Sequence, residues 1–249
     1  MKVHKDNGYF IQLVDNTLDV LEALSETDQN VHVTRLSERL GMNKSKVFRL
    51  LATFQRRGYV EQEQGSHSYR LGLSAFETSQ RCLSRMKLLG KARPVMEELV
   101  RKCDEAAYLV VRRANEVLFL DLVDTTQQVK VVTLTGRRFP LITTAAGKVF
   151  QAFGESTTGP GGSARELAEI KRLGYCLQEN DIAPGITSLA APLFNSGNEV
   201  IGALTLLGPD FRLRSDRVSV EVRGALLDAA QTISSRLGTL SNYRHAQGA

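Results

Sequence analysis

Residues 33–71, VTRLSERLGMNKSKVFRLLATFQRRGYVEQEQGSHSYRL, contain the most regular pattern in the chain. Within residues 44–57, apolar side chains recur at i, i+3, i+4 and i+7, the spacing of one buried helix face: Val47, Leu50, Leu51 and Phe54. Because successive residues turn by about 100°, the opposite face carries small, hydroxylic or cationic side chains: Ser45, Arg49, Ala52, Thr53 and Arg56, flanked by Lys44 and Lys46. Such side chains suit phosphates, guanine edges and thymine methyls, so we expect this helix to lie in a DNA groove.

Signals before this helix define its N-terminal neighbour. Asn43 stands where an N-cap is needed. Upstream, Leu36 and Leu40 lie four residues apart on a short helix that Thr34 can cap. Gly41-Met42-Asn43 separates the two helices and has the length of the turn in helix-turn-helix units.

A β-hairpin is predicted directly after the helix, which Gly58 ends. Gly58-Tyr59-Val60 and Tyr69-Arg70-Leu71 enclose a polar tip, Gln64-Gly65-Ser66-His67, which would form a wing. An amphipathic helix over residues 11–24 would complete a three-helix core. The alternative is a surface helix beside a hairpin with solvated cations, and His67 is then a solvated loop residue rather than a phosphate contact.

The charge distribution favours DNA binding. The net charge of +5 is modest, but residues 35–57 hold seven cations against Glu38 alone. Residues 74–102 hold seven cations and three acids, whereas residues 103–249 hold fifteen of each. A basic segment followed by a charge-balanced segment is typical of a DNA-binding domain with an appended sensor.

Composition excludes several classes of protein. With 42% hydrophobic and 24% charged residues, the chain is globular, and no apolar run is long enough for a membrane helix or a signal peptide. The cysteines, Cys82, Cys103 and Cys176, are odd in number and form no CxxC pair, as expected in a reducing cytoplasm. The four histidines share no ligand spacing, so we predict no metal site and no cofactor.

The second half of the chain predicts an α+β domain. A helix over about residues 74–89 would act as a linker, and Pro94 would open the next helix. Strand patterns follow at residues 107–111, 117–120 and 129–134, and later at about 185–193 and 199–207. Helices are expected at 145–153, capped by Thr144, around Leu167 to Leu173, and at about 216–237. Residues 157–162 read as a surface loop. An antiparallel sheet with helices on its faces follows from this order.

Several motifs in this order resemble the IclR family of bacterial transcriptional regulators. They are Arg49-Leu50-Leu51-Ala52-Thr53, Gly58-Tyr59-Val60, Tyr69-Arg70-Leu71-Gly72, Ala92-Arg93-Pro94, Pro140-Leu141-Ile142-Thr143-Thr144-Ala145-Ala146-Gly147-Lys148, Gly174-Tyr175, Pro184-Gly185-Ile186-Thr187-Ser188-Leu189-Ala190-Ala191-Pro192, Ala203-Leu204 and Gly208-Pro209. The resemblance covers almost the whole chain.

The resemblance implies three parts: an N-terminal winged helix-turn-helix over residues 8–72, with three helices and a hairpin wing; a linker helix over 73–89; and a C-terminal GAF-like α+β effector-binding domain over 90–249. It further implies a homodimer or homotetramer that binds a palindromic operator on double-stranded DNA and responds to a small metabolite. The DNA-binding residues would be Lys44, Ser45, Lys46, Arg49, Thr53, Arg56 and His67.

By the same resemblance, the effector would lie over the sheet beside the helix that contains Gly147-Lys148. Its predicted contacts are the amides of Ala145 and Ala146, the apolar Leu141 and Ile186, and the hydroxyls of Ser188 and Thr205. A helix N-terminus is an anion site, which suits a carboxylate. Gln178 stands where some relatives have an acid, Ser188 where a cysteine is common, and Leu207 where a second hydroxyl can occur. The site is therefore more apolar than one for a very small oxoacid, and we expect an aromatic or medium-sized organic acid. Alternatively, Leu141, Ile186 and Leu207 are ordinary core.

Enzyme classes fit the sequence poorly, and no catalytic residue is predicted. There is no G-x-S-x-G elbow, and Gly147-Lys148 is followed by Val149 and preceded by Ile142 where a phosphate loop needs glycine. The main alternative is a metabolite sensor whose N-terminal head binds a protein partner instead of DNA. A weaker one is an enzyme built on the GAF-like domain.

Overall fold

The structure is a computed structural model, and it describes residues 9–27, 30–154, 162–213 and 220–239. The chain divides into two compact units, Met1–Arg85 and Met86–Ala249. The expected loop at 157–161 and the expected start of the last helix at 216–219 lie outside the described residues, as does residue 8 at the start of the first predicted domain.

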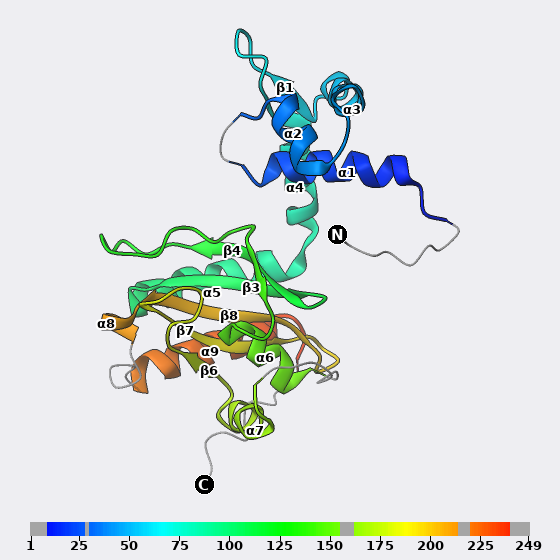
Figure 1. The fold of residues 1–249 in the computed structure, drawn as a ribbon. Coiled ribbons are helices and arrows are strands. Elements are labelled where there is room, and N and C mark those ends of the chain that lie inside the picture. Colours follow the sequence, from blue (N-terminus) through cyan, green and yellow to red (C-terminus); the bar gives the residue numbers. More distant parts are fainter. Residues whose placement is uncertain (1–8, 28–29, 155–161, 214–219, 240–249) are drawn as a thin grey trace. The chain divides into compact units, whose positions relative to one another are not determined.

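The N-terminal unit has the predicted winged helix-turn-helix arrangement (Figure 1). Its elements are α1 (Gln12–Ser25), α2 (Val33–Leu40), α3 (Lys44–Arg56), β1 (Val60–Gln62), β2 (Tyr69–Leu71) and α4 (Leu73–Arg85). The stripe of Val47, Leu50, Leu51 and Phe54 is buried against Val20 and Leu24 of α1 and Leu36 of α2. The antiparallel strands β1 and β2 form the wing, and Val31 bridges to Tyr69 and closes the core beside it.

Two local expectations in this unit were wrong. The helix α2 begins at Val33, one residue before Thr34, and its N-cap is His32 with no side-chain hydrogen bond. The linker helix expected up to residue 89 ends at Arg85, because Met86 leaves the helical conformation (φ −77°, ψ 98°) and serves as the N-cap of α5 (Lys87–Cys103).

The C-terminal unit is built on an antiparallel sheet of six strands in the order β5-β4-β3-β8-β7-β6. The strands are β3 (Ala106–Arg113), β4 (Glu116–Val123), β5 (Arg138–Pro140), β6 (Cys176–Gln178), β7 (Ile186–Phe194) and β8 (Val200–Pro209). The predicted α+β class and antiparallel sheet are therefore confirmed.

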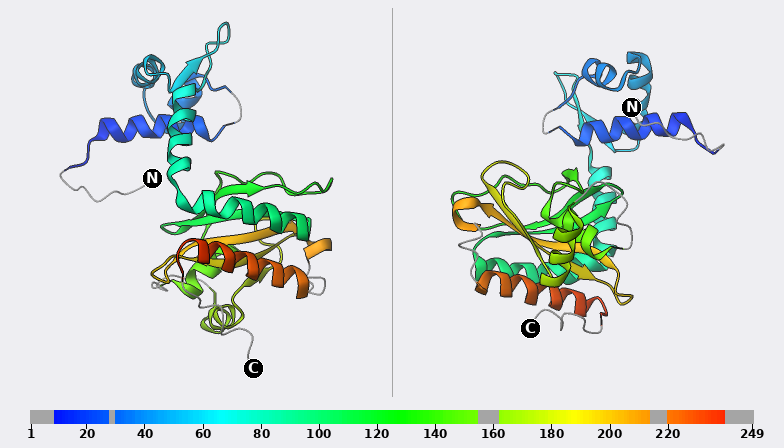
Figure 2. Two further views of the ribbon diagram at one scale, coloured as in Figure 1. Left: turned by 180° about the vertical axis from the view of Figure 1, so that it is seen from behind. Right: turned by 60° about the horizontal axis from the view of Figure 1, so that its bottom comes forward.

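Helices cover both faces of this sheet. On one face, α5 and α9 (Val220–Arg236) lie side by side over Leu109, Leu189 and Leu204 (Figure 2). On the other face, α6 (Ala145–Phe153) packs over Tyr108, Ala190 and neighbouring core residues, with α7 (Ala164–Leu173) against α6. A short helix, α8 (Asp210–Leu213), follows β8.

The structure differs from the predictions made from the sequence at four further points. Residues 129–134 do not form a strand; the outer edge of β4 pairs at Glu116–Leu118 with β5, a strand that the sequence analysis did not predict. The short strand β6 was missed as well. Pro94 lies inside α5 and does not open it; the carbonyl left without its intrahelical donor belongs to Gly90.

Within these described ranges, no helix combines the length and apolar character needed to span a bilayer.

Candidate functional site

The exposed face of α3 begins at a well-capped N-terminus. The side chain of Asn43 accepts a hydrogen bond from the backbone N–H of Lys46 at 2.7 Å. This bond satisfies one of the free amides of the first turn and fixes where the helix starts. The buried stripe then determines which side chains face outward.

The structure brings six of the seven predicted DNA-binding residues onto this face. Lys44, Ser45, Arg49, Thr53 and Arg56 are exposed, and Lys46 is half-buried. The seventh, His67, is exposed near the tip of the wing with a φ of 52°. The hydroxyl of Thr53 donates to the carbonyl of Arg49 at 2.9 Å.

Charge pairing separates the cations of α3 from others in the same unit. Arg39 forms an ion pair with Glu26, and Arg70 pairs with Glu61 at 3.0 Å. Across the described part of the chain, no acid pairs with the four cations of the α3 face, Lys44, Lys46, Arg49 and Arg56. Cations without acidic partners are available to neutralise phosphates.

A cleft of about 550 Å³ opens along this face. It is lined by Leu13, Asn43, Ser45, Lys46, Arg49, Leu50 and Thr53. Four of the predicted DNA-binding residues therefore line one surface. Leu13 of α1, which is 59% exposed, was missed by the sequence analysis, since an apolar residue on a flanking helix gives no signal of a binding role.

In the C-terminal unit, strand register gathers the predicted effector residues under α6. Ser188 of β7 lies opposite Gln178 of β6 and Leu207 of β8, and Thr205 lies opposite Ala190 and Tyr108. Residues directly opposite one another share a face of the sheet. Leu207, Ala190 and Tyr108 pack with Leu141, Ala145 and Ala146, so this is the α6 face. Ile186 is half-buried at its edge.

The N-terminus of α6 is occupied by groups of the protein itself. The Thr144 hydroxyl accepts from Gly147 N–H at 3.0 Å, which confirms the predicted cap. Ala145 N–H, predicted as an effector contact, donates to Asp181 Oδ2 at 3.2 Å. Asp181 lies in the loop between β6 and β7 and was not predicted; an acid shortly before the Pro184-Gly185 turn was the available signal.

A second unpredicted group lies beside it. Lys148 Nζ contacts Glu166 Oε1 of α7 at 2.6 Å and Gln178 Oε1 at 2.5 Å. Gln178 thus contacts α6 through Lys148. We define the α6 site as Ala145, Ala146, Lys148, Gln178, Asp181, Ser188 and Thr205.

Burial shapes the chemistry of the α6 site. Desolvation raises the pKa of Asp181, opposed by Ser188, the Ala145 amide and Lys148. It also raises the pKa of the nearby Cys176 thiol to about 12. Ser188 Oγ approaches Asp181 closely enough to lower its pKa, but not in hydrogen-bond geometry. Ser188 and Thr205 are 0% and 1% exposed, and neither hydroxyl has a hydrogen-bond partner in the described structure. Burying a hydroxyl without a hydrogen-bond partner lowers the stability of the fold, so such groups are expected to bond a ligand or a water molecule.

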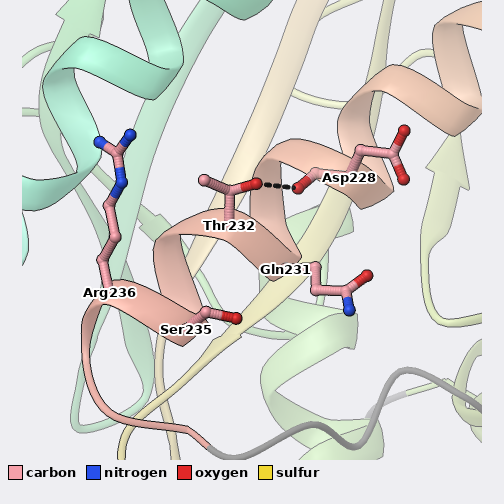
Figure 3. A pocket seen from close by; sticks show the side chains of 5 residues that line it. All are labelled: Asp228, Gln231, Thr232, Ser235 and Arg236. Carbon is pink, nitrogen blue, oxygen red and sulfur yellow. Dashed lines mark hydrogen bonds between the residues drawn. The ribbon is translucent and has the colours of Figure 1, made fainter.

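Another depression lies on α9 and is lined by Asp228, Gln231, Thr232, Ser235 and Arg236 (Figure 3). All five come from one helix and are exposed, and Thr232 donates its hydroxyl to the carbonyl of Asp228 at 2.8 Å. This depression is an open helix surface and does not enclose a ligand.

Comparison with known proteins decides the family. The model of the IclR helix-turn-helix domain matches residues 13–64, and the model of the bacterial transcriptional regulator IclR C-terminal domain matches residues 80–160 and 157–235. The chain belongs to the IclR family. It is therefore a transcriptional regulator and not an enzyme, and its relatives include the transcriptional repressor IclR of Escherichia coli, at 25% identity over 249 residues.

Other IclR-family relatives match over similar lengths. The regulator KdgR of Dickeya chrysanthemi is 30% identical over 238 residues, which cover 88% of this chain and 77% of KdgR. The regulator BhcR of Paracoccus denitrificans is 27% identical over 243 residues, covering 90% and 86%. Among solved structures, Pseudomonas aeruginosa HmgR superposes with a TM-score of 0.76 at 27% identity, covering 92% of this chain and 100% of HmgR.

A further solved structure carries a ligand. An IclR homologue from Microbacterium hydrocarbonoxydans, complexed with 4-hydroxybenzoate, superposes with a TM-score of 0.78 at 24% identity and covers 90% of this chain and 98% of the homologue. At this identity the likeness shows the shared fold.

Proposed function

We propose that this IclR-family regulator binds a palindromic operator through the α3 face and the wing, and that a small organic acid bound in the α6 site changes its affinity for that operator. The observation that carries the DNA-binding part is the α3 face itself. It presents cations that pair with no acid in the described part of the chain, and hydroxyl groups beside them, around a capped N-terminus, while its apolar side is buried in the core.

The residues divide by the contacts that they can make. Arg49 and Ser45 lie in the first turns of α3, the part of a recognition helix that reaches base edges. Lys44, Lys46 and Arg56 would bind phosphates, and His67 would contact the backbone beside the wing. Thr53 is exposed, and its methyl group would contact the methyl group of thymine.

A palindromic operator requires two copies of α3 related by a two-fold axis. We therefore propose a homodimer or homotetramer. The effector would act by changing the balance between subunit arrangements that space two α3 helices correctly and those that do not.

The α6 site supports an organic acid as the effector. Ala146 N–H at the N-terminus of α6 and the buried hydroxyls of Ser188 and Thr205 offer hydrogen bonds, while Leu141 and Leu207 provide apolar walls. A site with a few hydrogen-bonding groups between apolar walls favours an aromatic or medium-sized acid. The ligand of the Microbacterium homologue makes 4-hydroxybenzoate the first compound to test.

The test has two arms. Selection from a random duplex library should yield inverted half-sites separated by about one helical turn or a multiple of it. Affinity for the selected duplex, measured by fluorescence anisotropy, should fall steeply as salt is raised, because phosphate neutralisation releases counterions. Duplex binding without salt dependence would favour a protein partner instead.

The second arm screens organic acids. An effector should raise the melting temperature and change the anisotropy-measured affinity for the same duplex. Ser188→Ala, which removes a buried hydroxyl without adding bulk, should weaken the response to the acid. An unchanged response would place the effector elsewhere.

A further inference from the structure

The acid-binding position at the start of α6 already holds a carboxylate. Asp181 Oδ2 accepts from Ala145 N–H at 3.2 Å. Thr144 takes two further N–H groups of the first turn, Gly147 through its hydroxyl at 3.0 Å and Lys148 through its carbonyl at 2.9 Å. The four amides that precede the first intrahelical bond are those of Thr144, Ala145, Ala146 and Gly147, and of these Thr144 and Ala146 have no acceptor among the described residues.

We propose that Asp181 is an internal competitor of the effector: its carboxylate holds the N-terminus of α6 in the free protein, and the acid group of the effector must displace it to bind. The inference rests on the proposed effector function. It adds that the carboxylate of Asp181 must leave the N-terminus of α6 before the effector can bind there. It makes Asp181 the residue that sets the affinity for small monocarboxylates.

The loop that carries Asp181 fixes its backbone beside the start of α6. Asp181 N–H donates to the carbonyl of Ile186 at 2.9 Å, and Gly185 N–H donates to the side chain of Asn180 at 2.9 Å. Gly185 has a φ of 80°, which glycine adopts without strain. Although part of the residue is exposed, the carboxylate oxygen Oδ1 is buried and has no hydrogen-bond partner among the described residues, so Asp181 fills this position with only one of its two oxygens bonded.

Charge makes simultaneous occupancy unfavourable. The titratable groups around the Asp181 carboxylate are Lys148 of α6, Glu166 of α7 and Cys176 of β6. The thiol of Cys176 is neutral at ordinary pH, since burial raises its pKa to about 12. One cation therefore faces two carboxylates, and a bound acid would add a third negative charge in a partly dehydrated site.

Burial also weakens the hold of Asp181 on this position. Desolvation is the largest effect on its carboxyl and raises its pKa, so the ionised form is less favourable here than in water. An incoming carboxylate that also bonds Ser188 and Thr205, whose buried hydroxyls have no partner among the residues that the structure describes, gains contacts that Asp181 does not make in full.

The experiment uses acetate, which reproduces the removed side-chain carboxylate, and needs no knowledge of the natural effector. The melting temperature of the full chain is measured against sodium acetate, with sodium chloride at equal ionic strength and neutral acetamide as references. For Asp181→Ala we expect saturable stabilisation by acetate alone, with an apparent affinity at least about tenfold above that of the unsubstituted protein.

Two further variants complete this test. Asp228→Ala removes an exposed carboxylate from α9 and should respond like the unsubstituted protein. Asp181→Asn keeps the shape and an acceptor for Ala145 but removes the charge, so its acetate response should be intermediate, and it serves if the alanine variant does not fold. Equal stabilisation of the unsubstituted protein, or none of either Asp181 variant, would overturn the proposal.

Measuring operator affinity distinguishes a failure of this inference from a failure of the proposed function. If acetate binds Asp181→Ala but no acid changes operator affinity in any variant, internal competition stands and the effector function fails. If an acid releases the operator in a manner that depends on Ser188 while Asp181→Ala gains no affinity for acetate, the function stands and the competition is refuted.

Discussion

Gly147 lies directly against the backbone of Leu141. A Cβ built on Gly147 would lie 1.8 Å from the carbonyl oxygen of Leu141 and 2.8 Å from the hydroxyl of Thr144. The first turn of α6 can therefore rest on the turn at residues 140–144 only with glycine at this position. This contact places the N-terminus of α6, and with it the amides of Ala145 and Ala146, over the sheet.

We predict that Gly147→Ala destabilises the C-terminal unit by about 1–3 kcal/mol, because the obstacle is backbone and cannot move aside like a flexible side chain. Urea unfolding followed by circular dichroism measures the loss. Gly90→Ala in α5 is the matched control: a Cβ there meets nothing within 4 Å, and the change should stabilise by about 0.5–1 kcal/mol. Equal stabilities of the two variants would contradict the argument.

Asn43→Ala should lower the stability of the N-terminal unit by about 1 kcal/mol, since it removes the acceptor for Lys46 N–H. Asn43→Asp retains that acceptor and adds a negative charge at a helix N-terminus, so it should keep full stability. Thermal unfolding of both variants measures the difference. If alanine and aspartate behave alike, the cap contributes nothing.

Arg49→Ala should weaken operator binding by about 1–3 kcal/mol and relax the base preference at one position of each half-site. Lys44→Ala should instead lower affinity evenly over all sequences and flatten the salt dependence. Fluorescence anisotropy with operator and mismatched duplexes separates the two roles. Lys171→Ala, an exposed cation on α7, is the charge-matched control. Unchanged operator affinity in Arg49→Ala would refute its assignment.

Arg212→Ala should cost about 3–5 kcal/mol, because it leaves the Glu105 carboxylate, 4% exposed, without its cation. Arg212 Nη2 lies 3.0 Å from Glu105 Oε2 and also donates to the carbonyl of Val129 at 2.9 Å. Lys102→Ala breaks an exposed pair with Glu98 and should change the stability little, because solvent screens an exposed ion pair. Denaturant titration at neutral pH compares the variants, and similar losses would show that burial is unimportant.

The cysteines should differ in reactivity towards iodoacetamide at pH 8. The thiolate is the reactive form, and burial raises the pKa of Cys176 to about 12, so this thiol stays protonated throughout the neutral range. Cys82 is exposed and should be alkylated first. Peptide mass spectrometry of the native protein gives the order, and labelling in urea provides the control. Rapid native labelling of Cys176 would show that the α6 face opens.

Local patterns predicted the N-terminal unit well because its architecture follows from periodicity and turn length. The stripe from Val47 to Phe54, the cap at Asn43 and the wing are all present. The errors occurred where tertiary contacts overrode local preference. Residues 129–134 alternate like a strand but pair with none, and the strand that does pair with β4 is β5, at Glu116–Leu118. Pro94 suggests a helix start, yet α5 continues through it, since Val95, Met96 and Leu99 are buried against the sheet.

The amino-acid sequence by itself determined the resemblance to the family, the helix-turn-helix with its wing, and the cationic face of α3. Each of these depends on residues close together in the chain, whose spacing fixes which side chains share a surface. Only the tertiary structure decided what lies at the N-terminus of α6. Asp181 is 36 residues from Ala145, and the two meet because the loop between β6 and β7 is held over α6 by the sheet. No local pattern encodes a contact between segments that only the folded sheet brings together.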